Sequence, residues 1–389
     1  MTASPATALV IGGSLGGLAA AHEFGAIGAD VTVYERSVDR TQPRGAGIVM
    51  QPEVEALLAR LGRSVPSVSI LLQERQQLHR DGSARGYGAP QWMTAWDTLY
   101  SALRQGLPEE GYRLGSELVA LDVDGDCVTA MFADGHRASG DFLVGADGVG
   151  STVRSSMKIP GMPSYSGYVA FRGLEPETQL PTELIRLLAE RFTMFAAPGL
   201  QLLCYLVPGA GGELEPGARR VNWVWYVNTE EANLPWLLTG NSGRRFDHFV
   251  PPGELTPETI ARIAALAREH LPPQFVALVE HSNVFMQPVF DVPPARMAGD
   301  HTALIGDAAG TVRPHTASGT SKAFGDAAAL AHAIDTAHSD GDLPPNLKQW
   351  EGQRLSHLVA VARHGIRLAS QSALGVAGPQ FLSESRKAG

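Results

Sequence analysis

The chain has few cysteines, no long apolar run and fewer basic than acidic residues, and each shortage narrows what it can be. Two of its 389 residues are cysteine, Cys127 and Cys204, too few for a disulfide framework or a cysteine-based zinc site. Both lie in apolar runs, so we expect them to be inert core residues. No metal site is predicted.

Membranes and nucleic acids are also disfavoured as partners. No run approaches the roughly 20 apolar residues of a membrane span, and the N-terminus lacks the basic and apolar segments of a signal peptide. The formal net charge is −9, with scattered lysines and arginines, which argues against an anionic polymer or membrane surface. We expect a cytoplasmic protein whose partner is a small molecule.

The beginning of the chain has the pattern of a dinucleotide-binding βαβ unit. Residues 8–11 form an apolar run typical of a buried parallel strand, the glycine-rich residues 12–18 open a helix, and a second apolar run ends on Glu35. The helix start favours a pyrophosphate, and the acid accepts hydrogen bonds from an adenosine ribose. Glu35 follows Gly12 by 23 residues (35 − 12), close to the spacing of about 20 that this unit needs.

The turn departs from the usual fingerprint at one position. Gly12, Ser14 and Gly17 occupy its three glycine sites, so a serine replaces the middle glycine and its Cβ must be accommodated beside the phosphates. A glycine-rich strand-to-helix turn can also exist without a ligand. Glu35 favours the binding interpretation.

Other loops lie where open α/β sheets bind ligands, at the carboxyl ends of predicted strands. Asp147-Gly148 follows the apolar run 142–144, and Gly306-Asp307 ends a buried strand ahead of a helix predicted from residue 320. Asp307 can accept from a sugar hydroxyl, although an Asp-Gly pair alone is a common turn. Arg44, in the glycine-rich loop 44–48, can contact phosphate or flavin, or can lie in a solvated turn.

Residues 165–284 have a different texture, with alternating strand patterns and many aromatic residues. They predict a separate, mainly antiparallel sheet, most of whose aromatics pack in its core while a few line a flat apolar pocket. The predicted fold class is α/β, a Rossmann-like domain with this inserted sheet and a C-terminal helix. The predicted parts are 1–70, 94–164 and 285–340 for the dinucleotide domain, 71–93 and 165–284 for the substrate-binding sheet domain, and 345–389 for the helical segment.

The order of the three strand-end sites resembles the class A flavoprotein monooxygenases, the single-component aromatic hydroxylases, over nearly the whole chain. The loops at 12–18, 44–48, 313–315 and 319–322 are most similar to the 2,6-dihydroxypyridine 3-hydroxylase branch, bacterial enzymes that hydroxylate electron-rich N-heterocycles. The resemblance implies an FAD-binding fold like those of glutathione reductase and p-hydroxybenzoate hydroxylase, and a homodimer.

The resemblance also implies which residues hold tightly bound FAD. It places the glycine-rich turn on the pyrophosphate, Glu35 on the ribose, and Asp307 on ribityl or pyrophosphate oxygens. Relatives often carry an arginine near position 96, where this chain has Trp96. The implied cofactor residues are Gly12, Ser14, Leu15, Gly17, Glu35, Arg36, Arg44, Asp147, Gly148, Asp307, Ser318, Gly319, Thr320 and Ser321.

The implied chemistry consumes NADH or NADPH and O2. The nicotinamide reduces FAD, oxygen adds as a C4a-hydroperoxyflavin, and a hydroxyl group passes to a small electron-rich aromatic ring. A side chain that deprotonates or strongly hydrogen-bonds a ring hydroxyl would activate that ring. The candidate catalytic residues are Tyr205, His248, Gln287 and His315, and the candidate pocket residues are Phe195, Tyr205, Trp225 and Pro314.

Each candidate also has a structural explanation. Tyr205 can be a core residue, His248 a solvated loop residue, Gln287 a strand-end hydrogen-bonding group and His315 a residue that fixes its loop.

The sequence leaves other functions open. A flavin-dependent reductase or oxidase acting on a non-phenolic substrate could share the fold. An NAD-dependent dehydrogenase is disfavoured, because such an enzyme needs no second loop at Gly306-Asp307. A nucleotide-binding protein without catalysis is a further alternative.

Overall fold

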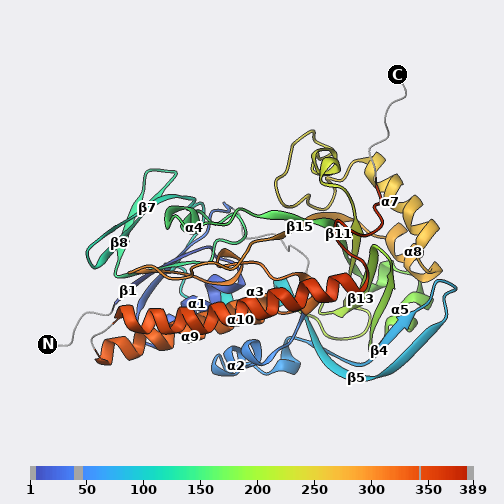
Figure 1. The fold of residues 1–389 in the computed structure, drawn as a ribbon. Helices are drawn as coiled ribbons and strands as arrows, with labels where there is room; N and C mark the ends of the chain where they lie inside the picture. The colour runs from blue at the N-terminus through green and yellow to red at the C-terminus, as the bar shows by residue number, and fades with distance from the viewer. Residues whose placement is uncertain (1–5, 39–46, 341–342, 383–389) are drawn as a thin grey trace.

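A parallel sheet underlies the N-terminal part of the chain (Figure 1). The computed structural model describes residues 6–38, 47–340 and 343–382. Five strands pair in parallel in the order β16–β10–β1–β2–β6. Their bounds are Thr302–Leu304 (β16), Phe142–Gly145 (β10), Thr7–Ile11 (β1), Asp30–Tyr34 (β2) and Tyr112–Arg113 (β6).

The βαβ unit predicted at the N-terminus is present. Helix α1, Leu15–Ala26, links β1 to β2, and its buried residues face the sheet. The β1, β10 and β16 strands are almost wholly buried, as expected when helices or chain cover both faces of a parallel sheet. The α/β fold class is therefore confirmed.

The second sheet has eight strands in the order β15–β11–β14–β13–β12–β4–β5–β3. Its neighbours pair antiparallel except β12 and β4, which are parallel. The bounds are Gly47–Val49 (β3), Ile70–Leu78 (β4), Ala84–Ala95 (β5), Ser164–Pro176 (β11), Arg191–Ala197 (β12), Leu200–Val207 (β13), Arg220–Asn228 (β14) and Phe285–Asp291 (β15).

The hydrogen bonding of β3 and β15 differs from the predicted parts. Residues 1–70 and 285–340 are predicted to belong to the dinucleotide domain, yet β3 and β15 form the two edges of the eight-stranded sheet. Their apolar patterns do not reveal which sheet they join. The domain boundaries stay a prediction.

A third, small antiparallel sheet contains Cys127, one of the two cysteines expected in the core. It consists of Leu118–Asp124 (β7), Cys127–Phe132 (β8) and Arg137–Gly140 (β9). Cys127 is exposed because it is the first residue after the β7–β8 turn, whereas Cys204 is buried as expected. Burial raises the pKa of the Cys204 thiol well above its ordinary value.

Two long helices run side by side along the molecule (Figure 1). They are Gly319–Asp340 (α9) and Leu343–Gln371 (α10). Within the described part of the chain, no helix is both long and apolar enough to cross a bilayer. The remaining α-helices are Pro52–Arg60 (α2), Trp96–Arg104 (α3), Thr152–Ser156 (α4), Thr182–Leu188 (α5), Leu234–Leu237 (α6), Pro257–His270 (α7) and Pro273–Glu280 (α8).

A buried ionic cluster joins these two helices to the loop after β16. The side chains of Lys322 and Asp326 on α9 are fully buried and lie 3.1 Å apart, and Arg354 on α10 donates to the other Asp326 oxygen at 2.7 Å. The Lys322 ammonium donates to the Gly306 carbonyl at 2.6 Å, and the Gly306 N–H donates to Asp326 at 3.1 Å. The cluster therefore fixes the loop that carries Asp307.

We predict that Asp326→Ala strongly destabilises the protein. It leaves Lys322 buried without its counter-ion, and breaking a buried pair in this way costs about 3–5 kcal/mol. Urea unfolding measures the change. Glu183→Ala, which removes an exposed partner of Arg186, should have little effect. An Asp326→Ala protein as stable as the wild type would contradict the role given to the cluster.

Candidate active site

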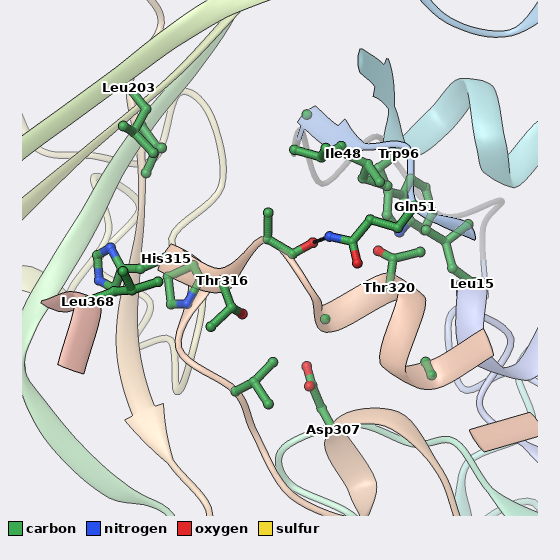
Figure 2. A pocket seen from close by; sticks show the side chains of 18 of the residues that line it. Leu15, Ile48, Gln51, Trp96, Leu203, Asp307, His315, Thr316, Thr320 and Leu368 are labelled. Carbon is green, nitrogen blue, oxygen red and sulfur yellow. Dashed lines mark hydrogen bonds between the residues drawn. The ribbon is translucent and has the colours of Figure 1, made fainter. Parts of the chain in front are cut away.

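A cavity of about 800 Å³ lies between the parallel-sheet loops and one face of the eight-stranded sheet. Figure 2 shows Leu15, Trp96 and Thr320 on one side of it and Leu203, His315 and Leu368 on the other, with Asp307 pointing in from below. Residues from both ends of the chain therefore line one cavity. Its size suits a bound small molecule or cofactor.

The first wall is built on the tight turn before α1. Gly12 has φ +103°, and a Cβ there would lie 2.4 Å from the Ala146 carbonyl oxygen, while a Cβ on Gly17 would lie 1.8 Å from the Gly12 oxygen. Only glycine fits both positions. Ser14 precedes α1 without a side-chain capping hydrogen bond, and Ser14 and Leu15 line the cavity, so the helix start is open to a ligand.

Glu35 is buried just behind this turn. One carboxylate oxygen accepts the Gly13 N–H at 2.8 Å, and the other accepts the N–H and hydroxyl of Ser37 at 2.9 and 2.8 Å. A carboxylate has about four acceptor sites, so one is left for a ribose hydroxyl. Arg36 is exposed and does not line the cavity, and Arg44 lies outside the described residues.

Asp147 organises its own loop rather than facing the cavity. It accepts from the Ser151 hydroxyl at 2.5 Å and from the N–H groups of Thr152 and Val153 at 2.8 and 3.1 Å. Burial raises the pKa of Asp147, and these hydrogen bonds oppose the rise. Its neighbour Gly148 is the residue of this pair that lines the cavity.

Asp307 is the acid that faces the cavity, where its side chain is accessible. The surrounding protein withdraws it from bulk water and raises its pKa; Lys322 lowers the pKa and Asp326 raises it further. No hydrogen-bond partner for its carboxylate is found among the described residues, so it can accept from a ligand hydroxyl.

The start of α9 completes the first wall. Gly319 and Thr320 line the cavity, and the space where a Cβ of Gly319 would lie is open. Ser318 and Ser321 are instead turned toward protein: their hydroxyls donate to the Thr316 carbonyl at 3.0 Å and to Gln51 at 2.6 Å. Two open helix starts with an unpaired acid between them fit a dinucleotide cofactor.

The second wall consists of alternate residues of neighbouring strands. Phe192 and Met194 of β12, Tyr205 of β13, and Val224 and Tyr226 of β14 face the cavity. Phe195 and Trp225, predicted for the pocket, are corrections. Successive strand residues point to opposite faces, and both of these side chains are buried in the core on the other face.

His315 and Pro314 both line the cavity, but the ring nitrogens of His315 are already occupied. Nδ1 lies 2.8 Å from the Gln201 side-chain oxygen, and Nε2 lies 3.1 Å from the Tyr168 hydroxyl. Because an amide oxygen only accepts, Nδ1 carries the proton and Nε2 accepts from Tyr168. Burial and the Arg313 charge lower the pKa of His315 to about 4, so the ring is neutral.

The structure does not bring His248 or Gln287 to the cavity wall. His248 is exposed and its ring packs edge-on against Phe290, with ring centroids 5.2 Å apart. Gln287 pairs with Ala170 on β15, the edge strand.

Several cavity residues were missed from the sequence. Three of them, Arg75, Arg172 and Gln201, lie on strands whose two faces have similar residue patterns. The sequence therefore does not predict which way their side chains point. Gln51 and the α10 residues His364, Leu368 and Gln371 also line the cavity. Trp96, noted as a departure from the family, is a wall residue as well and stacks on Tyr100 with centroids 4.8 Å apart.

Comparisons with known proteins agree with this geometry. A family model described as FAD binding domain-like matches residues 165–291. The 2,6-dihydroxypyridine 3-monooxygenase of Paenarthrobacter nicotinovorans is 32% identical, covering 93% of this chain and 90% of that protein. The 6-hydroxynicotinate 3-monooxygenase of Pseudomonas fluorescens is 25% identical, covering 86% and 83%.

Solved structures give the same result. The 2,6-dihydroxypyridine-3-hydroxylase from Arthrobacter nicotinovorans superimposes with a TM-score of 0.89 and 30% identity, over 98% of this chain and 99% of that one. HpxO of Klebsiella pneumoniae, solved with FAD and uric acid, has a TM-score of 0.75 over 94% and 89%. At 21% identity this second match supports the fold alone.

We predict that Gly17→Ala lowers both the thermal midpoint and the retained FAD, because the added Cβ would force the turn away from Gly12. Gly25→Ala is the matched control on the same helix, since a Cβ at Gly25 meets no atom within 4 Å and alanine is the better helix former by about 1 kcal/mol. Differential scanning fluorimetry and flavin absorbance give the two values. A Gly17→Ala protein that keeps its FAD and its midpoint would contradict the tight-turn interpretation.

We predict that His315 makes the protein less stable as the pH falls. The ring pKa is about 4 in the folded protein against an ordinary 6.5, so between these values only the unfolded chain takes up the proton. The loss should reach roughly 2 kcal/mol, allowing for the partial exposure of the ring. Urea unfolding at several pH values measures it.

His315→Gln should flatten this pH dependence below about pH 6.5. Substituting the exposed His79 by glutamine should leave the dependence as it is in the wild type. If the wild-type and His315→Gln curves ran parallel, the ring would not be the source of the effect.

Proposed function

The chain belongs to the class A flavoprotein monooxygenases, and we propose that it uses NADH or NADPH and O2 to hydroxylate a small electron-rich aromatic or N-heteroaromatic ring of the hydroxypyridine type. One observation carries the proposal. One cavity has dinucleotide-type loops on one wall and aromatic and hydrogen-bonding side chains on the facing wall. A cofactor and a flat ring can therefore be held face to face.

The residues of the first wall, with Glu35 buried behind it, are suited to FAD. The start of α1 at Ser14 and Leu15 would hold the pyrophosphate, Glu35 a ribose hydroxyl, and Asp307 with the start of α9 the remaining polar groups. Bound FAD would supply the redox chemistry, reduced by the nicotinamide and reacting with O2 to deliver an oxygen atom. The chain itself must orient the ring and keep water out.

The second wall would orient the ring by donating hydrogen bonds. Burial raises the pKa of the Tyr205 phenol, an effect larger than the opposing influence of the Arg172 charge, so Tyr205 stays protonated at neutral pH and acts as a donor. His315 is neutral and bonded on both nitrogens, which makes it a positioning residue for Gln201. Substrate activation therefore depends on donors to ring oxygens rather than on removal of a proton by either residue.

A flavin-dependent reductase or oxidase on a non-phenolic substrate is the second candidate. It would use the same cofactor wall but would not insert oxygen into its product. Oxygen stoichiometry and the mass of the product separate the two reactions.

We predict that the purified protein is yellow and that 2,6-dihydroxypyridine accelerates NADH oxidation with matching O2 uptake and a product heavier by one oxygen atom. An oxygen electrode, nicotinamide absorbance and mass spectrometry provide the readouts. Tyr205→Phe should lower kcat/KM by about tenfold through the lost hydrogen bond. Tyr87→Phe, at an exposed site, should not. NADH oxidation without oxygen insertion, across a panel of hydroxypyridines and phenols, would contradict the hydroxylase assignment.

A further inference from the structure

Arg172 is a partly buried cation on the cavity wall, and no carboxylate among the described residues is its counter-ion. It lies on β11 and lines the cavity, and its Nε is fully buried with no hydrogen-bond partner. Among the described residues, no carboxylate or carbonyl accepts a hydrogen bond from its guanidinium. A buried N–H donor without an acceptor is costly, so the Arg172 Nε has a free donor that a ligand in the cavity can satisfy.

Three other buried or partly buried arginines of this chain have partners for their guanidinium groups. Arg220 makes a two-point ion pair with Asp97 at 2.7 and 2.8 Å, and Arg313 does the same with Asp291 at 3.0 and 2.6 Å. Arg154 donates to the carbonyls of Ala308 and Val149. Unlike these three arginines, Arg172 has no acceptor for its guanidinium among the described residues.

The strand register places further unpaired donors next to Arg172. Across the sheet, Arg172 is opposite Val224, and Val224 is opposite Leu203, which gives an apolar row with the cation at one end. The adjacent row on one side contains Tyr226 and Gln201, and the row on the other side contains Tyr205. Polar side chains therefore lie in the rows on both sides of this apolar row.

The donors of these two rows are free to bind a ligand. The hydroxyls of Tyr205 and Tyr226 have no hydrogen-bond partner among the described residues. His315 donates to the Gln201 oxygen, which leaves the Gln201 amide N–H groups for the cavity. Within the described lining, the one carboxylate is Asp307, on the opposite wall. The arrangement therefore favours an acceptor, and an anionic one at Arg172.

We propose that Arg172 binds an oxyanion of the substrate ring, so that the enzyme takes the ionised form of a hydroxylated N-heterocycle or phenol. The inference rests on the proposed function and specifies the charge state of its substrate. An ionised ring is more electron-rich and is therefore better prepared for attack by an electrophilic oxygen. Neither Tyr205 nor His315 is then required to act as a base.

The test uses the FAD-loaded enzyme and two probes of the same ring, 2,6-dihydroxypyridine, which ionises, and 2,6-dimethoxypyridine, which has no acidic hydroxyl. Perturbation of the flavin absorbance reports binding without turnover. Arg172→Gln should weaken the dihydroxy probe by about 10- to 100-fold, as expected for loss of a charged hydrogen bond. The dimethoxy probe should change little, and Arg172→Lys should lie between wild type and Arg172→Gln for the dihydroxy probe.

Arg75→Gln is the matched charge control. Arg75 lines the same cavity, but its guanidinium already donates to Gln91 at 2.5 and 3.1 Å. Removing it should change both probe affinities alike. The second readout is the pH at which the bound dihydroxy probe ionises, followed by probe absorbance. That pH should rise in Arg172→Gln, because the charge that stabilises the anion is gone.

The outcomes separate this inference from the proposed function. If the wild type binds and hydroxylates the dihydroxy probe while Arg172→Gln binds it equally well, or loses both probes equally, the role of Arg172 is wrong and the function stands. Loss of FAD rather than of probe binding would place the guanidinium on the cofactor and would also overturn the proposal. A wild type that binds neither probe would contradict the proposed function and this role together.

Discussion

The close contact between the N-terminal turn and the loop after β10 is the constraint on which the rest of the site depends. A Cβ at Gly12 would clash with the Ala146 carbonyl, and a Cβ at Gly17 would clash with the Gly12 carbonyl. Glycine at both positions therefore lets the chain turn from β1 into α1. This places the start of α1 at the carboxyl edge of the parallel sheet, where its N–H groups face the cavity. Glu35 secures the same turn from behind through the Gly13 N–H.

The opposite end of the chain completes the site through buried charge. Lys322, Asp326 and Arg354 join α9 and α10 to the loop that carries Asp307. In contrast to Arg172, every member of that cluster is paired. Paired ionic groups thus fix one wall of the cavity, where their role is structural. On the other wall the guanidinium of Arg172 has no partner among the described residues and can bind a ligand.

Local pattern was sufficient for the features that depend on neighbouring residues. The βαβ unit, Glu35 and the strand-end position of Asp307 could all be predicted, because strand, turn and helix are specified within a few residues of one another. Side-chain direction could not. Phe195 and Trp225 are predicted for the pocket, yet Met194 and Tyr226 line it. Both faces of these strands are apolar, and only the packing of the whole sheet decides which face meets the cavity.

Hydrogen bonding within loops was equally hidden from the sequence. Asp147, Ser318 and Ser321 have the residue types of cofactor ligands, yet their side chains bond to their own loop or to Gln51. The contribution of α10 to the cavity wall depends on how two distant segments pack, whereas the sequence predicts only a C-terminal helical segment.

A crystal structure of the enzyme with FAD and 2,6-dihydroxypyridine tests the central claim most directly. The account predicts the FAD pyrophosphate at the start of α1, its flavin ring inside the cavity, and the pyridine ring against the strands that carry Tyr205 and Arg172. Density for FAD away from the Gly12 turn, or for the pyridine ring outside this cavity, would contradict it.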